Sequence, residues 1–171
     1  SNCAMAYWGM ALVLGPNINA TMDPENNPAA YEALQKAMQL APKSTEKEQA
    51  YIQALAKRYQ ADPTKDRGPL DIPYADAMRA LHQRYPDDRE AATLFAESLM
   101  DLHPWDYWQS DGQAKSWTPE LLEVLESVMA GNPEHPGANH LYIHAVEASK
   151  TPERGLPSAK RLGKAVPGAG H

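Results

Sequence analysis

Apolar residues along this chain recur at spacings of three and four residues, which is the period of an amphipathic helix. Stretches rich in proline, glycine, aspartate and asparagine separate the periodic segments and indicate turns or loops. The pattern predicts an all-α fold with eight helices, over about 3–14, 29–40, 44–59, 70–84, 89–102, 118–130, 136–148 and 152–164. Capping residues and acidic first turns support several of the starts, including Asn2 before Cys3, Ser44-Thr45 before Glu46, and Thr118 before Pro119-Glu120.

The predicted helices fall into repeated pairs. An aromatic residue followed four positions later by an aliphatic one occurs at Trp8/Leu12, Tyr51/Leu55, Phe95/Leu99 and Tyr142/Val146. Each copy is closed by a proline that ends a second helix, namely Pro42, Pro86, Pro133 and Pro167. Repeats build their core between neighbours and need about three units for stability. We therefore expect one repeat domain over 1–171, with copies at about 1–42, 43–86, 87–133 and 134–167.

This layout resembles the tetratricopeptide repeat family. The matching residues are the small Gly9 and Ala96 after an aromatic, the series Ala30, Leu34, Ala37 and Pro42, and the Asp/Asn/Pro-rich turns between copies. Segments 103–108 and 139–147 also resemble uncharacterised bacterial members of the family, a likeness that brings no known activity. The resemblance implies a right-handed superhelix of helix pairs that holds a partner protein or peptide on its concave face. We also expect the chain to be a piece of a longer array, whose uncapped ends could self-associate.

Charge and cysteine content narrow the function classes. The net charge is −6 and the charges are interspersed, which disfavours a nucleic-acid surface because such a surface clusters lysine and arginine. The single cysteine, Cys3, forms no intrachain disulfide and does not identify a compartment, so a cytoplasmic and a periplasmic location both remain open. The apolar stretch from Ala4 to Leu14 is too short to span a bilayer.

Polar residues offset from the aromatic positions are expected to line the concave face. They are Gln49 and Gln53 in the second copy, Glu90, Thr93, Glu97 and Asp101 in the third, and His140, His144 and Glu147 in the fourth. Charge complementarity then favours a basic or amide-rich extended peptide as the partner. The alternative is that these charges form ordinary solvated helix faces. The lysine and arginine residues with which related adaptors hold acidic C-terminal tails are missing, so such tails are not expected as partners.

The fourth copy also supports a second hypothesis, that of a metal-binding or metal-dependent module. His140, His144 and Glu147 follow one another at spacings of four and three residues, which places them on one stripe of a helix. Two imidazoles and a carboxylate can bind zinc or copper, and His171 is a possible further ligand. The alternative is that these side chains only hydrogen-bond to one another or to water. Since no other catalytic motif is present, we do not expect an enzyme unless this cluster holds a metal.

Three of the chain's four tryptophans lie in the long loop predicted between 103 and 117. Trp105, Tyr107 and Trp108 are candidates for anchoring a protein partner or for stacking on a sugar. The alternative is that these rings cover the ends of neighbouring helices, because an ordered loop of this length must pack on something.

Overall fold

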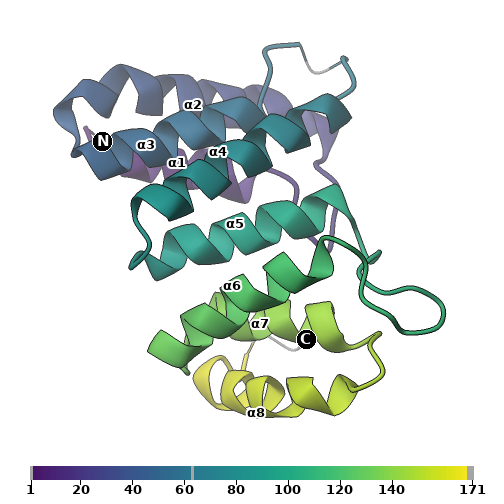
Figure 1. The fold of residues 1–171 in the computed structure, drawn as a ribbon. Coiled ribbons are helices and arrows are strands. Elements are labelled where there is room, and N and C mark those ends of the chain that lie inside the picture. The colour runs from purple at the N-terminus through teal and green to yellow at the C-terminus, as the bar shows by residue number, and fades with distance from the viewer. Residues whose placement is uncertain (1, 63, 169–171) are drawn as a thin grey trace. The chain divides into compact units, whose positions relative to one another are not determined.

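The protein is all-α, with eight α-helices in the residues that its structure, a computed structural model, describes: 2–62 and 64–168 (Figure 1). The chain divides into two compact units, Ser1–Pro86 and Asp87–His171, and each is described by itself. Unit 1 holds α1 (Ala4–Val13), α2 (Asn27–Leu40), α3 (Glu46–Leu55) and α4 (Asp71–Arg84). Unit 2 holds α5 (Arg89–Leu102), α6 (Thr118–Gly131), α7 (Pro136–Val146) and α8 (Leu156–Ala165).

Local sequence explains where the helices begin. Thr45 and Glu48 form a reciprocal capping box at the start of α3, and the Asp88 carboxylate accepts a hydrogen bond from the Ala91 N–H at the start of α5. Proline in the first turn of α6 and α7 suits a position where no backbone donor is needed. All eight predicted helices are confirmed, with boundary differences of a few residues. The largest differences arise because the last turn predicted for α3 and the first turn predicted for α8 are 3₁₀ turns, Ala56–Arg58 and Pro152–Gly155.

In unit 1, consecutive helices pack against one another, and the most extensive contact is between α1 and α2. Alanines allow this approach, since Ala4 and Ala37 are buried together with Ile52 of α3. Trp8 meets Tyr51 edge to face, with ring centroids 5.5 Å apart. The first two copies of the predicted pattern therefore share one core.

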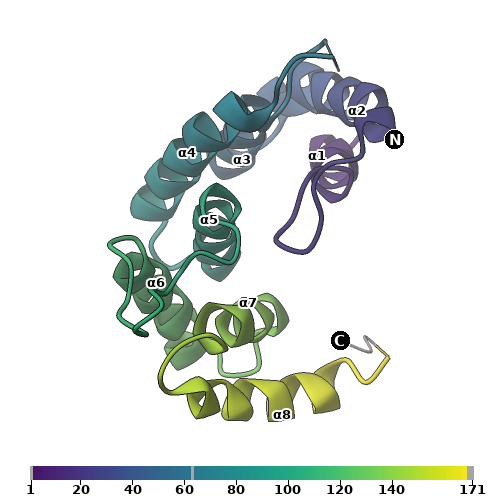
Figure 2. The same cartoon turned by 90° about the vertical axis from the view of Figure 1, so that its right-hand side faces the viewer.

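In unit 2, α6 packs against both α5 and α7, and α8 packs against α7 (Figures 1 and 2). The fully buried side chains at these contacts include Phe95, Leu121, Leu125 and Val146. Gly155 brings the turn before α8 close to α7, because a methyl group there would lie 3.3 Å from Val146 Cγ2. The α7–α8 pair is held to α6 through α7 and also directly, since Ser158 Oγ donates to Met129 Sδ and Arg154 pairs with Glu126.

Three of the four aromatic positions of the predicted repeats are core positions, as Tyr51, Phe95 and Tyr142 are buried, while Trp8 is half-buried. The boundary between the units, after Pro86, coincides with the boundary predicted between the second and third copies. Gly9, one of the small residues that carry the family resemblance, does not lie at a close contact, because a methyl group at this position would meet nothing within 4 Å.

Candidate functional site

The aromatic loop, residues 103–117 of unit 2, is pinned to the helices on either side of it. The Trp108 indole N–H donates a hydrogen bond of 2.7 Å to the Ala145 carbonyl of α7. The Thr118 hydroxyl at the start of α6 donates to the Tyr107 carbonyl, and the Lys115 N–H donates to the same oxygen at 3.1 Å. These bonds hold the loop in one conformation, although it has no regular secondary structure of its own.

Two of the loop's aromatic residues, Tyr107 and Trp117, serve its internal packing. Tyr107 is only 3% exposed. The Trp117 ring stacks on His103 with centroids 3.8 Å apart, and its N–H donates to the Asp106 carbonyl. Burial lowers the pKa of His103, and this outweighs the effect of the nearby Asp106 charge. Half-buried Trp108, bonded to Ala145 of α7, fits the interpretation that loop rings cover the ends of neighbouring helices, whereas Tyr107 and Trp117 pack within the loop.

Trp105 differs from its neighbours because its side chain is 53% exposed. Its backbone φ is 60°, in the left-handed region that a bulky residue rarely adopts. In this conformation the indole meets the His144 ring edge to face, with centroids 5.0 Å apart. Such a backbone persists only where the surroundings fix it, and it is enriched at functional sites.

The predicted stripe on α7 is present, and its members contact one another. The rings of His140 and His144 lie 4.9 Å apart, and His144 Nδ1 lies 3.1 Å from Glu147 Oε1. Among the described residues, however, no group of three or more His, Cys, Asp or Glu side chains is arranged to hold a metal ion. His171 lies outside the described residues. The zinc or copper hypothesis therefore stays a prediction that the geometry of α7 does not support.

Two carboxylates lie close to the aromatic loop. The pKa of the Tyr107 hydroxyl is raised to about 12, chiefly by burial and further by the charges of Asp101 and Glu147. The charges of Asp101, at the end of α5, and of Glu147, at the end of α7, thus act on the same buried Tyr107 hydroxyl. We call these two acids, together with Trp105 and the contacting rings of His140 and His144, the Trp105 surface.

The remaining predicted groove residues do not behave as one surface. Thr93 is 6% exposed and donates to the Arg89 carbonyl within α5, so its placement on an open groove was wrong. The Glu90 carboxylate lies 3.2 Å from His135 Nε2. In unit 1, the Gln49 amide donates to the Ser44 carbonyl at the start of its own helix, while Gln53 is exposed on α3. Glu97 is half-buried on α5.

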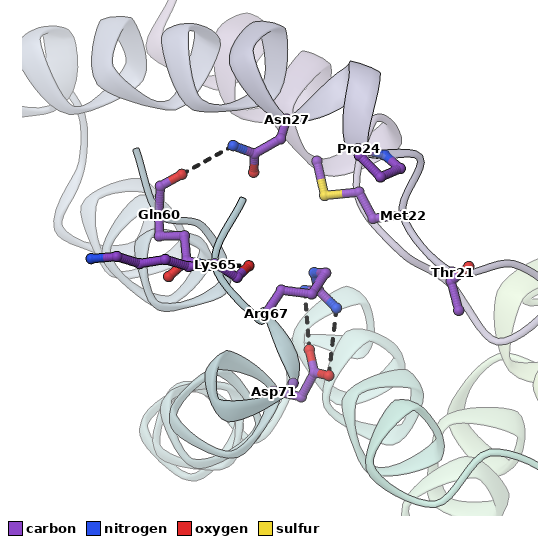
Figure 3. A pocket seen from close by; sticks show the side chains of 9 residues that line it. Thr21, Met22, Pro24, Asn27, Gln60, Lys65, Arg67 and Asp71 are labelled. Atoms are coloured by element: carbon purple, nitrogen blue, oxygen red, sulfur yellow. Dashed lines mark hydrogen bonds and ion pairs between the residues drawn. The ribbon is translucent and has the colours of Figure 1, made fainter. Parts of the chain in front are cut away.

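A pocket of about 390 Å³ in unit 1 was not found from the sequence (Figure 3). It lies between the segment that leads into α2 and the loop that joins α3 to α4. Its lining residues are Thr21, Met22, Pro24, Asn27, Gln60, Lys65, Arg67, Gly68 and Asp71. The only sign of this pocket in the sequence is the pair of cations Lys65 and Arg67, which lie in a stretch predicted to be a loop between helices.

Comparison with known proteins found no matching family model, no matching curated protein and no matching solved structure. Within the described residues no helix is both long and apolar enough to cross a membrane. Inference about function therefore depends on the side-chain geometry of the two units.

That geometry offers binding chemistry in both units. The Trp105 surface combines an exposed indole with carboxylates, which suits a cationic group because such a group is attracted to both. The pocket of unit 1 combines a guanidinium with apolar side chains. Neither place contains a nucleophile paired with a general base, which is the arrangement that covalent catalysis needs.

Proposed function

We propose that this protein is an interaction module built from helix pairs of the tetratricopeptide type, and that unit 2 binds a basic segment of a partner protein on the Trp105 surface. The observation that carries the proposal is the exposed Trp105 ring, fixed at a positive φ against His144, whose Nδ1 contacts the Glu147 carboxylate. The charges of Asp101 and Glu147 both act on the Tyr107 hydroxyl in the same loop. The helical pairing seen in each unit supports the repeat architecture.

Rigidity supports a binding role for Trp105. An aromatic anchor contributes most when its conformation is fixed before binding, because less conformational entropy is then lost. The bonds from Trp108 to Ala145 and from Thr118 to Tyr107 fix the loop directly after the exposed ring. A partner would therefore meet an indole that is already in place.

Charge supports a basic partner. A lysine or arginine side chain next to the indole gains a cation–π contact, and the Glu147 carboxylate can pair with it. Glu147 is exposed, so a partner can reach it. An acidic segment would be repelled by the same carboxylates, which gives the surface a means of discrimination.

The test compares two short peptides of equal length, one rich in lysine and arginine and one with glutamate at the same positions. Binding to the full chain is followed by fluorescence anisotropy of a dye on the peptide. We expect the basic peptide alone to bind, and Trp105→Ala to weaken its binding by about tenfold or more, as for a central aromatic anchor.

The matched control is Leu156→Ala, which removes another exposed apolar side chain of unit 2, one that is 56% exposed. This variant should bind like the parent chain. Equal binding of the acidic peptide, or unchanged binding by Trp105→Ala, would contradict the proposal.

A further inference from the structure

The pocket of unit 1 has the size and composition of a small-molecule site. Its volume of about 390 Å³ falls in the range of ligand pockets. It is lined by side chains from both connecting segments, with Met22 and Pro24 on one side and Gln60, Arg67 and Asp71 on the other (Figure 3). Apolar walls with a few polar groups are typical of sites that bind small organic molecules.

Arg67 is the central polar group of the pocket. Figure 3 shows its guanidinium between the Asp71 carboxylate and the Met22 side chain. Arg67 Nη2 lies 3.1 Å from Asp71 Oδ1, and Nη1 lies 3.5 Å from Oδ2. The carboxylate thus holds the guanidinium in place, while a guanidinium has five N–H donors and can serve a ligand as well.

Asn27, which lines the same pocket as Arg67, supplies a hydrogen-bond acceptor. The side chain is 92% buried, since only 8% of the residue is exposed, and its Nδ2 donates a hydrogen bond of 3.1 Å to the Gln60 carbonyl. This bond fixes the orientation of the amide, because a carbonyl can only accept. Asn27 Oδ1 then remains as an acceptor with no hydrogen bond among the described residues.

The lining carries a net positive charge, although the whole chain carries −6. Lys65 and Arg67 outweigh the one lining carboxylate, Asp71. Lys65 is exposed at the rim, where its charge acts on the Asp62 carboxylate. Because its side chain is exposed and flexible, Lys65 can also turn toward an anion that enters.

We propose that this pocket binds a small hydroxycarboxylate. The carboxylate of the ligand meets Arg67 and Lys65, its hydrocarbon body packs on Met22 and Pro24, and its hydroxyl donates to Asn27 Oδ1. The ligand thereby supplies Asn27 Oδ1 with a donor, and the Arg67 and Lys65 cations with an anion.

The probe is 2-hydroxyhexanoate, and binding to the full chain is measured by titration calorimetry. Two analogues each remove one feature: 2-hydroxyhexanamide lacks the charge, and hexanoate lacks the hydroxyl. We expect the hydroxycarboxylate to bind at least about tenfold more tightly than either analogue, because each loses one polar contact in a partly buried site. Equal affinity for the amide, or no binding of any of the three, would overturn the proposal.

Two pocket variants, each with a matched control, test the location of the site without changing the Arg67–Asp71 pair. Thr21→Glu places a carboxylate at the pocket, and Asn19→Glu places the same charge on the same loop outside the lining. Lys65→Gln removes the rim charge, and Lys36→Gln removes a charge from an ion pair elsewhere on unit 1. Only the pocket variants should lose affinity, by about fivefold or more. If the two control variants lost as much affinity for 2-hydroxyhexanoate, the effect would be due to overall charge, and the proposed location of the site would be wrong. Because these residues belong to unit 1, the outcome is independent of basic-peptide binding by unit 2.

Discussion

The indole of Trp105 lies edge-on to the imidazole of His144, with ring centroids 5.0 Å apart, while the Trp105 backbone has a φ of 60°. A non-glycine residue in this region costs on the order of 1 kcal/mol or more. The aromatic contact recovers a similar amount, about 0.5–1.5 kcal/mol. The position is therefore close to neutral for folding, and exposure of the ring is better explained by binding than by stability.

Trp105→Gly should consequently change the free energy of unfolding by less than about 1 kcal/mol, because glycine adopts a positive φ without strain. Trp108→Phe should cost about 1–3 kcal/mol, since it leaves the Ala145 carbonyl without its donor. Urea unfolding followed by circular dichroism measures both. If the glycine variant proved the less stable of the two, the account of Trp105 as a binding residue would be wrong.

Gly15 and Tyr59 should show strong coupling in unit 1. The Tyr59 hydroxyl donates to the Ala11 carbonyl at the end of α1, and a methyl group on Gly15 would lie 2.3 Å from that hydroxyl oxygen. Gly15→Ala should therefore destabilise the protein by about 1–3 kcal/mol through overpacking. In a Tyr59→Phe background the same change should cost clearly less, because the clashing oxygen is gone. A double-mutant cycle by urea unfolding measures this coupling, and additive costs would contradict it.

Alkaline pH should weaken unit 1 through the same tyrosine. Burial raises the pKa of Tyr59 to about 12, above the value of about 10 for an exposed tyrosine. A pKa that is higher in the folded state means that the stabilisation is complete below about pH 10 and is lost as pH rises toward 12. The loss should reach about 2 kcal/mol, and Tyr59→Phe should show a smaller decline. Thermal unfolding across this pH range measures the stability of the parent protein and of Tyr59→Phe. If the stability of both fell equally with pH, Tyr59 would be excluded as the cause.

The helices were predictable because local signals agree with packing. The bounds of α5 match the predicted 89–102, since Asp88 caps its start and buried residues such as Phe95 follow the helical period. The site was less accessible to such reasoning. The sequence located Trp105, His144 and Glu147, but it does not record the positive φ that leaves one tryptophan exposed while its neighbours pack inward. Thr93 was misplaced because spacing alone does not show that its face of α5 is covered.

The pocket of unit 1 was missed for a related reason. Asn27 and Arg67 are forty residues apart in the chain, and only the packing of α2 beside α3 brings their segments together. No periodic pattern links a residue in the first turn of one helix with a residue in a later loop. Contacts of this kind depend on tertiary structure, which the repeat pattern predicts only in outline.

His135 should be a stability residue of unit 2. Its Nδ1 accepts a hydrogen bond from the Ala138 N–H at the start of α7, so the ring proton is on Nε2, which faces the Glu90 carboxylate at 3.2 Å. His135→Ala should cost about 1–2 kcal/mol through loss of the cap. Glu90→Gln should cost less than about 0.5 kcal/mol, because Glu90 is exposed to solvent. Urea unfolding ranks the two variants, and the reverse order would show that the contact with Glu90, and not the cap, is the important one.

Zinc should not bind stoichiometrically to the stripe on α7. A three-ligand site needs donor atoms that converge on one point about 2.0–2.2 Å away. Here His144 Nδ1 is engaged by Glu147, the Trp105 ring lies against the His144 ring, and the rings of His140 and His144 meet edge to face. Elemental analysis after soaking in zinc and desalting should give far less than one equivalent, unchanged in the His140→Ala/His144→Ala double variant. If the parent protein bound one equivalent of zinc and the double variant bound none, Trp105 would have to move away from His144. Metal binding and peptide binding would then compete for the Trp105 surface.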